Sequence, residues 1–348
     1  MKNKIFNCVI ALTCVVFASC ENLVVMNTKV HEDGSVDKTI MLGKQDSFRV
    51  EVNPFGINQS ANWDVSVEKS KDEKDGDSDK LDITFTKSFA SVDDMNKELD
   101  RNIDSLFQIH ATFEKQFRWF YTYIYYSETI RPIDRLELVE ATDYFTREDF
   151  AFIDRLPGEG AAISKADSIY LQDLNEKIFD SYAEEGLFAE HFEILKGVVK
   201  KNTNDPKWLD TLLHKRHFVY EKMKKDDVGD PEYASLVADT LGIPISKQSA
   251  ESDFKELAKA FNARLGFMSY ARDGKYVNSI EMPWTVIRSN ADSVAGNTLY
   301  WKPLATKFAI QEFTMIAESR QFNWWTTALT SLLIGATIFL FVRRTKSI

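Results

Sequence analysis

The sequence predicts an α+β fold: an antiparallel or mixed sheet from N- and C-terminal strands, a helical insertion, and one C-terminal transmembrane helix. Short apolar runs alternate with turn residues over 23–89 and again over 276–317. A helical pattern fills most of the chain between them, from 146 to 270. A continuous apolar run over 324–342 follows the last expected strand. The strands at both ends therefore favour one sheet that the C-terminal strands complete.

Residues 1–19 have the pattern of a secretory signal peptide. Lysines precede an apolar stretch that ends in small residues, and this stretch is shorter than the roughly 20 residues that a spanning helix needs. Segment 17–20 (FASC) resembles a bacterial lipobox, although Phe17 replaces the usual Leu or Val. We therefore expect Cys20 to be acylated and to become the first mature residue. The alternative is an unmodified Cys20 within the leader.

The cysteines support an exported domain without disulfides. All 3 cysteines, Cys8, Cys14 and Cys20, lie in the leader region. An oxidising compartment permits disulfides without requiring them. A domain of this length buries enough apolar surface to fold without such cross-links.

The segment 20–145 is expected to be rich in β-strands. Its clearest hairpin signal is Asp33, Gly34 and Ser35, which lie between two apolar alternating runs. Strands are expected over 23–25, 36–42, 48–52, 63–67 and 81–85, and a helix over 92–109. The charged stretch 68–82 predicts a solvated loop between strands.

The segment 117–126 (FRWFYTYIYY) is mostly aromatic. Because both alternating faces would be bulky, it is expected to form a strand covered on both sides in the middle of the sheet. The alternative is an exposed platform on which sugar rings could stack. Its candidate ligand-binding residues are Trp119, Tyr121, Tyr123 and Tyr125.

Residues 146–272 predict the helical insertion. Thr146 and Asp149 have the spacing of a capping box, and two Asp-Pro pairs at 205–206 and 230–231 mark helix starts. Helices are expected over 164–182, 184–200, 206–225 and 250–268.

Residues 273–322 return to the strand pattern. Strands are expected over 276–282, 284–287, 299–301 and 307–317. They are expected to complete the N-terminal sheet. Two separate domains, one of strands and one of helices, are the alternative.

Residues 324–342 are expected to cross a membrane. As a helix they would rise about 28 Å, close to the roughly 30 Å of the hydrocarbon layer. Trp324 and Trp325 match the aromatic belt at one interface, and the basic tail 343–348 matches the cytoplasmic side. We therefore expect the domain to lie in the periplasm, held at the bacterial inner membrane.

The acidic net charge of the chain argues against a nucleic-acid partner. The 43 basic and 53 acidic residues give a net charge of −10. All charged residues of the leader and the tail are basic, so the exported part is more acidic still. An acidic surface repels phosphate backbones, so no nucleic-acid partner is expected. No cofactor is expected either, because no motif nominates one.

His214, His217 and Glu221 are the candidate metal ligands. Their spacing could place all three on one face of a helix. His217 also aligns with Leu209 and Leu213, which favours a histidine that faces the core. A metal site is therefore not expected.

Four features resemble bacterial envelope lipoproteins of the LppM-like group. They are Cys20, the turn at 33–35, the segment 297–301 (NTLYW), and the stretch 317–323 (AESRQFN) that leads into the apolar run. The resemblance covers the two ends of the chain, and the long helical segment departs from it. It implies an exported, membrane-held α+β domain.

The expected function is non-enzymatic binding or scaffolding of other envelope components, with a protein of the envelope as partner. One alternative is an envelope hydrolase that uses paired carboxylates or a metal near His214. Another is a lipid or glycan carrier with the aromatic segment as a pocket wall. No spacing in the sequence nominates a catalytic set.

Overall fold

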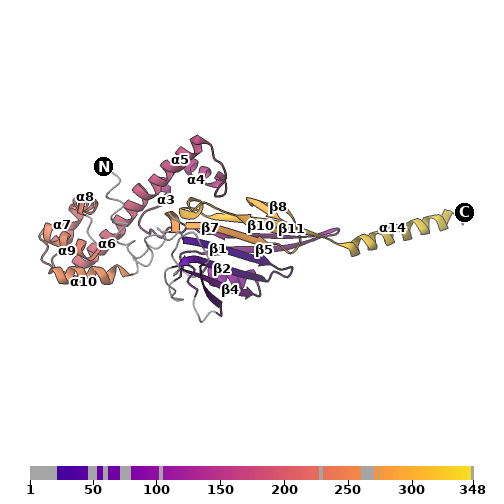
Figure 1. Ribbon diagram of the computed structural model, residues 1–348, viewed down its shortest axis with the longest axis horizontal. Helices are drawn as coiled ribbons and strands as arrows, with labels where there is room; N and C mark the ends of the chain where they lie inside the picture. The colour runs from indigo at the N-terminus through magenta and orange to yellow at the C-terminus, as the bar shows by residue number, and fades with distance from the viewer. Residues whose placement is uncertain are drawn as a thin grey trace. The chain divides into compact units, whose positions relative to one another are not determined.

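The computed structural model describes residues 22–45, 53–57, 62–70, 80–101, 105–226, 230–259, 270–272 and 274–345 (Figure 1). The expected signal peptide, Cys20 and the expected strand at 48–52 lie outside these residues. The chain forms two compact units. The strand unit comprises Leu23–Pro132, Lys275–Leu304 and Glu312–Ile348, and the helical unit includes Ile133–Gly274 and Ala305–Gln311. The predicted α+β class is confirmed.

The first sheet of the strand unit joins N- and C-terminal strands. It has seven strands in the order β3-β4-β2-β1-β7-β10-β9. The strands are β1 (Asn22–Val30), β2 (Val36–Gln45), β3 (Asp64–Lys69), β4 (Leu81–Phe89), β7 (Gly274–Glu281), β9 (Ser293–Ala295) and β10 (Thr298–Trp301). Contacts of Asn27 with Ser279 and of Lys29 with Glu281 advance in the same direction along β1 and β7, as in a parallel pair. The other neighbouring strands of this sheet are antiparallel.

The turn between β1 and β2 confirms the hairpin signal in the sequence. The Asp33 carboxylate accepts hydrogen bonds from the backbone N–H and the hydroxyl of Ser35. Gly34 has φ = +88°, and a Cβ there would lie 3.1 Å from the Phe113 ring. Both the left-handed backbone and the close ring therefore require glycine at this position.

The second sheet of the strand unit is antiparallel, with strand order β5-β6-β11-β8. Its strands are β5 (Ile109–Arg118), β6 (Tyr121–Ile130), β8 (Thr285–Ser289) and β11 (Phe313–Phe322). The expectation of one strand over 117–126 is wrong, because the chain reverses at Trp119 and Phe120 between β5 and β6. The expected helix over 92–109 is shorter, α2 (Val92–Leu99), because β5 begins at Ile109.

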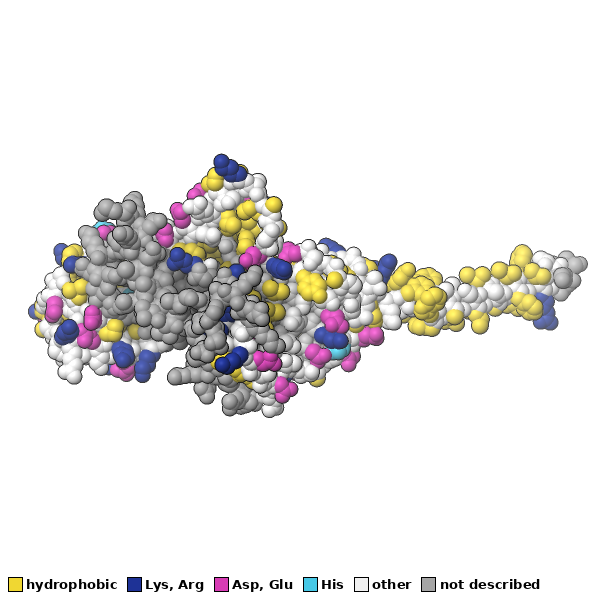
Figure 2. All heavy atoms as spheres, viewed as in Figure 1, with side chains coloured by type: hydrophobic (Ala, Val, Ile, Leu, Met, Phe, Trp, Pro, Cys, Tyr) yellow, Lys and Arg dark blue, Asp and Glu magenta, His cyan; other side chains and the backbone are white. Residues whose placement is uncertain are grey.

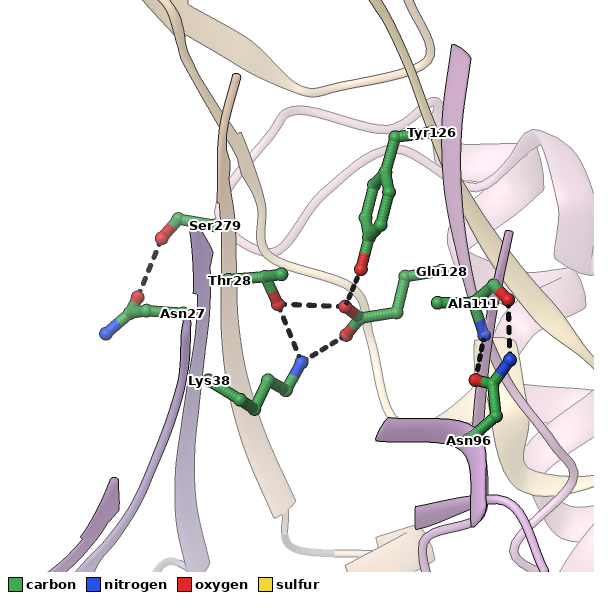
Figure 3. Close-up of polar contacts among 8 residues, drawn as sticks. All are labelled: Asn27, Thr28, Lys38, Asn96, Ala111, Tyr126, Glu128 and Ser279. Atoms are coloured by element: carbon green, nitrogen blue, oxygen red, sulfur yellow. Dashed lines mark hydrogen bonds and ion pairs between the residues drawn. The ribbon is translucent and has the colours of Figure 1, made fainter. Parts of the chain in front are cut away.

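A buried polar network joins the two sheets (Figure 3). Lys38 on β2 forms an ion pair with Glu128 on β6, and both side chains are at most 1% exposed. The Thr28 hydroxyl donates to Glu128 Oε2 over 2.8 Å and accepts from Lys38 Nζ. Tyr126 OH also donates to Glu128, and burial raises the pKa of Tyr126 well above its ordinary value. The sheets are therefore tied together by charge as well as by apolar packing.

The helical unit packs around its own apolar core. Its helices are α3 (Ala141–Tyr144), α4 (Arg147–Arg155), α5 (Lys165–Glu176), α6 (Glu184–Asn202), α7 (Pro206–His214), α8 (Arg216–Asp226), α9 (Asp230–Leu241), α10 (Lys247–Leu257) and α13 (Thr306–Ala309). A π-helical segment, η3 (Lys177–Ala183), joins α5 to α6. Leu212, Val219 and Phe254 are fully buried in the core formed by α6 to α10. The helix expected over 206–225 is divided at Lys215, whose backbone leaves the helical region.

The C-terminal helix, α14 (Trp324–Thr345), is long and apolar enough to cross a membrane. It has a mean hydropathy of 1.8 over its most apolar window, of which 6% is buried by the rest of the chain. Figure 1 shows α14 extending directly from the end of β11. The last strand and the apolar helix are thus one continuous piece of chain.

Candidate binding face beside the C-terminal helix

The outer face of the second sheet carries the tyrosines that the sequence singled out. Along β6, Ile124 and Tyr126 are buried between the sheets, whereas Tyr121, Tyr123 and Tyr125 alternate with them and are half-buried. Successive side chains of a strand point to opposite faces, so these three tyrosines share the outer face. Trp119 does not belong to this face, because it lies in the β5–β6 turn.

Neighbouring strands extend the tyrosine row into a patch three strands wide. Directly opposed residues of antiparallel strands share a face of the sheet. From the turn outward, the rows are Arg118, Tyr121 and Phe322; Gln116, Tyr123 and Arg320; and Glu114, Tyr125 and Glu318. We call these nine residues the tyrosine face. It is basic at the end near the turn and acidic at the other end.

The rings of the tyrosine face are packed and flanked by cations. Tyr123 and Tyr125 are stacked, with ring centroids 6.3 Å apart and an interplanar angle of 13°. The Arg118 guanidinium lies 5.5 Å from the Tyr123 ring centroid, and that of Arg320 lies 4.5 Å from the Tyr121 centroid. Such contacts stabilise a cation over an aromatic ring by roughly 0.5–1 kcal/mol at exposed sites. The rings and the guanidinium groups are therefore held in place before any ligand arrives.

A second group of aromatic side chains surrounds the start of α14. This aromatic collar consists of Phe117, Trp119, Phe120, Trp324 and Trp325, whose side chains are between 42% and 77% exposed. Phe117 stacks on Trp325 with centroids 5.8 Å apart. Trp119 Nε1 donates to the Thr330 hydroxyl over 2.9 Å. Figure 2 shows hydrophobic side chains gathered at the base of α14 and along it.

Asn323 fixes the junction between β11 and α14. Its backbone N–H donates to the Phe120 carbonyl over 2.9 Å, and its Nδ2 donates to the Trp119 carbonyl over 3.0 Å. Its Oδ1 accepts from the Thr122 hydroxyl over 3.0 Å. Its own carbonyl accepts from the N–H and the hydroxyl of Thr326 in the first turn of α14. The helix is therefore bonded to the β5–β6 turn as it leaves the sheet.

The candidate metal ligands do not form a cluster. His214 ends α7 and its Nδ1 lies 2.7 Å from the Asp210 carbonyl, whereas His217 and Glu221 lie on α8. No group of three His, Cys, Asp or Glu side chains that could hold a metal ion occurs among the described residues. The expectation that His217 faces the core is wrong, because His217 is exposed and Val219 occupies the core.

Two parts of the site are not predicted from the sequence. Arg320 and Phe322 lie on the tyrosine face because β11 pairs with β6, and no spacing within either segment reveals that pairing. Asn323 had a signal, since a polar residue directly before an apolar helix can cap it. No sequence pattern indicates the hydrogen bonds of Asn323 to the distant β5–β6 turn.

The fold and the face together define a two-sheet unit that continues into a membrane-length helix, with a separate helical unit. No protein-family model matches the chain, and no curated protein matches it. Among solved structures, it resembles the folded domain of LppM from Mycobacterium tuberculosis, determined by NMR. The match covers 89% of this chain and 95% of that chain, with 9% sequence identity and a TM-score of 0.31. This is a weak resemblance at the level of the fold, and membership of the LppM-like group stays a prediction.

Proposed function

We propose that this chain is a non-enzymatic, membrane-held protein that binds a partner protein of the bacterial envelope through the tyrosine face. The observation that supports it is the half-buried row of Tyr121, Tyr123 and Tyr125 between Arg118 and Arg320. Tyrosine and arginine are enriched at the centres of protein interfaces. A tyrosine supplies large contact area at low conformational cost, and the arginine fork donates several hydrogen bonds.

The proposed location follows from the ends of the chain. In this proposal α14 spans the inner membrane, Arg343 and Arg344 lie on the cytoplasmic side, and the strand and helical units lie in the periplasm. An acyl chain on Cys20 would add a second attachment to the same membrane. Because a spanning helix already retains the protein, the acyl chain would serve orientation or sorting.

The charges of the face specify the partner more closely. Arg118 and Arg320 lie toward the β5–β6 turn, and Glu114 and Glu318 lie at the opposite end. Arg288 on β8 lies directly opposite Glu318, so the carboxylate end is partly neutralised, whereas the arginine end keeps its positive charge. A complementary partner therefore presents acidic groups toward α14. This arrangement fixes the orientation of the partner, because the reverse orientation places like charges together.

The proposal is tested by co-purification after in-cell cross-linking. We expect the Tyr123→Ala/Arg320→Ala variant to recover at least about tenfold less partner than the wild type, since interface hot spots are worth 2 kcal/mol or more. Tyr300→Ala is the matched control, because Tyr300 is an exposed tyrosine on β10 of the other sheet. Equal recovery from the wild type and the double variant, or equal loss in the control, contradicts the proposal.

A further inference from the structure

We infer that the aromatic collar is embedded in the interfacial layer of the phospholipid bilayer that α14 crosses, so that the β5–β6 turn is a second membrane contact of the strand unit. This contact goes beyond partner binding. It depends on the part of the proposed function in which α14 spans the membrane. The occupant of the collar is thus lipid of the same bilayer.

The depth of the turn follows from its bond to α14. At about 1.5 Å per residue, the helix from Trp324 to the basic Arg343 is about as long as the hydrocarbon layer is thick. Thr330 lies about 9 Å along the helix from Trp324. The backbone of the turn is bonded to Asn323 and therefore lies at the interfacial level of the helix start, whereas the Trp119 indole donates to the Thr330 hydroxyl and reaches toward the hydrocarbon. If α14 crosses the bilayer, the β5–β6 turn therefore contacts the bilayer as well.

Two carbonyl groups and the indole N–H of the turn have hydrogen-bond partners, as an apolar environment requires. A backbone carbonyl without a hydrogen bond is costly in lipid, where water cannot replace the missing partner. The Trp119 and Phe120 carbonyls both accept hydrogen bonds from Asn323. The polar atom of the Trp119 ring is bonded to Thr330. The turn can therefore enter the interface without leaving these groups unpaired.

The side chains of the collar match the chemistry of the interface. Tryptophan is enriched where the hydrocarbon meets the headgroups, because its ring is apolar and its N–H is polar. Arg118 lies next to the turn, and its Nη2 donates a hydrogen bond to Gln116 Oε1. Gln116 lies in the next row of the tyrosine face, further from the turn. A long arginine beside lipid places its charge at the headgroup level in the same way. Exposed aromatic side chains and an arginine whose charge points away from the turn thus occur together at this end of the sheet.

The inference is tested with one fluorescent label at a time on the full-length chain. Cys8, Cys14 and Cys20 are replaced by Ser, and the environment-sensitive dye NBD is attached at Phe120→Cys in phosphatidylethanolamine–phosphatidylglycerol vesicles. A nitroxide quencher is carried on the lipid acyl chains. The control is Thr112→Cys, exposed on β5 about 20 Å along the strand from Arg118. Phe117→Cys is a second collar site, in case a change at the turn disturbs the hairpin.

We expect the collar labels to emit at shorter wavelength and to lose most of their emission to the lipid quencher, while the Thr112→Cys label does neither. Solvent-like emission at the collar overturns the inference. So does a blue shift without lipid quenching, or equal quenching at Thr112→Cys. A label at Leu333→Cys, in the middle of α14, separates the two claims: its quenching shows that the helix is in lipid whatever the collar does. Partner recovery by the tyrosine face is measured independently.

Discussion

Lys38 and Glu128 show at the scale of single residues how the interior of the strand unit is specified. Each lies on the buried face of its strand, and the two are joined across the sheets (Figure 3). Removing two charges from water costs several kcal/mol per ion, which the pair recovers only while both partners are present. Loss of one partner leaves a charge in the core.

We expect Lys38→Met to lower the free energy of unfolding by about 3–5 kcal/mol. Lys38→Met/Glu128→Gln should recover at least about 2 kcal/mol of this loss, because the remaining charge is gone and the Gln oxygen still accepts from Thr28 and Tyr126. The control Lys29→Met removes an ion pair with Glu281 that is exposed on both sides and should cost about 1 kcal/mol or less. Denaturant unfolding in detergent measures all three. A single variant as stable as the control would show that the pair is dispensable.

The sequence contained half of this information. Lys38 alternates with Val36 and Ile40, so period 2 places its side chain on the buried face of β2. A buried lysine requires a carboxylate nearby. Which of the chain's carboxylates supplies it depends on the pairing of two sheets, and no local pattern encodes that.

At the scale of single elements, the start of α4 is determined by its local sequence. The capping box predicted from Thr146 and Asp149 is present, with reciprocal hydrogen bonds between the side chain of each and the backbone of the other. Asp149 also accepts from Tyr170 OH over 2.6 Å and from Lys177 Nζ over 2.7 Å. The carboxylate thus ties α4 to α5 and to η3.

This carboxylate makes the stability of the helical unit depend on pH. Burial alone would raise the pKa of Asp149, but hydrogen bonds from Lys177, Tyr170 and the Thr146 backbone hold this pKa at about 2, below the ordinary 3.8. Because the folded-state pKa is lowered, the stabilisation is complete above about pH 4 and is lost as the pH falls toward 2. At about 1.4 kcal/mol per pH unit, it amounts to roughly 2–3 kcal/mol.

We therefore expect Asp149→Asn to be less stable than the wild type by roughly 2–3 kcal/mol at pH 7. The difference should shrink as the pH falls below about 4, since the wild-type carboxylate then gains a proton. Denaturant titrations followed by circular dichroism between pH 7 and pH 3 measure it. A difference that does not change with pH would exclude the carboxylate charge as its cause.

The β5–β6 turn shows where the same local reasoning fails. Two-residue hairpin turns commonly consist of Asn-Gly or Asp-Gly, whereas this turn consists of Trp119 and Phe120. The aromatic residues on both sides also hide the period of the strands. The contacts of the turn with Asn323 and Thr330 supply a reason for aromatic residues there, but that reason is visible only in three dimensions.

At the scale of the whole molecule, the fold class was predictable and the binding face was only partly so. Alternating runs at both ends indicated strands, and β1 and β7 do lie side by side in one sheet. The segment around Tyr123 was identified from composition. Its neighbour Arg320 comes from the far end of the chain, because β11 pairs with β6. Strand pairing over such distances is set by the packing of the whole sheet.

The most direct measurement is photo-cross-linking in living cells from a photoreactive amino acid placed at one position of the full-length chain. We predict that Tyr123 replaced in this way yields a discrete adduct with one membrane or periplasmic protein, because the proposed partner binds the tyrosine face. The same replacement at Tyr300, exposed on the other sheet, should give none. No protein adduct from position 123, or the same adduct from position 300, would contradict the assignment of the tyrosine face as the binding surface.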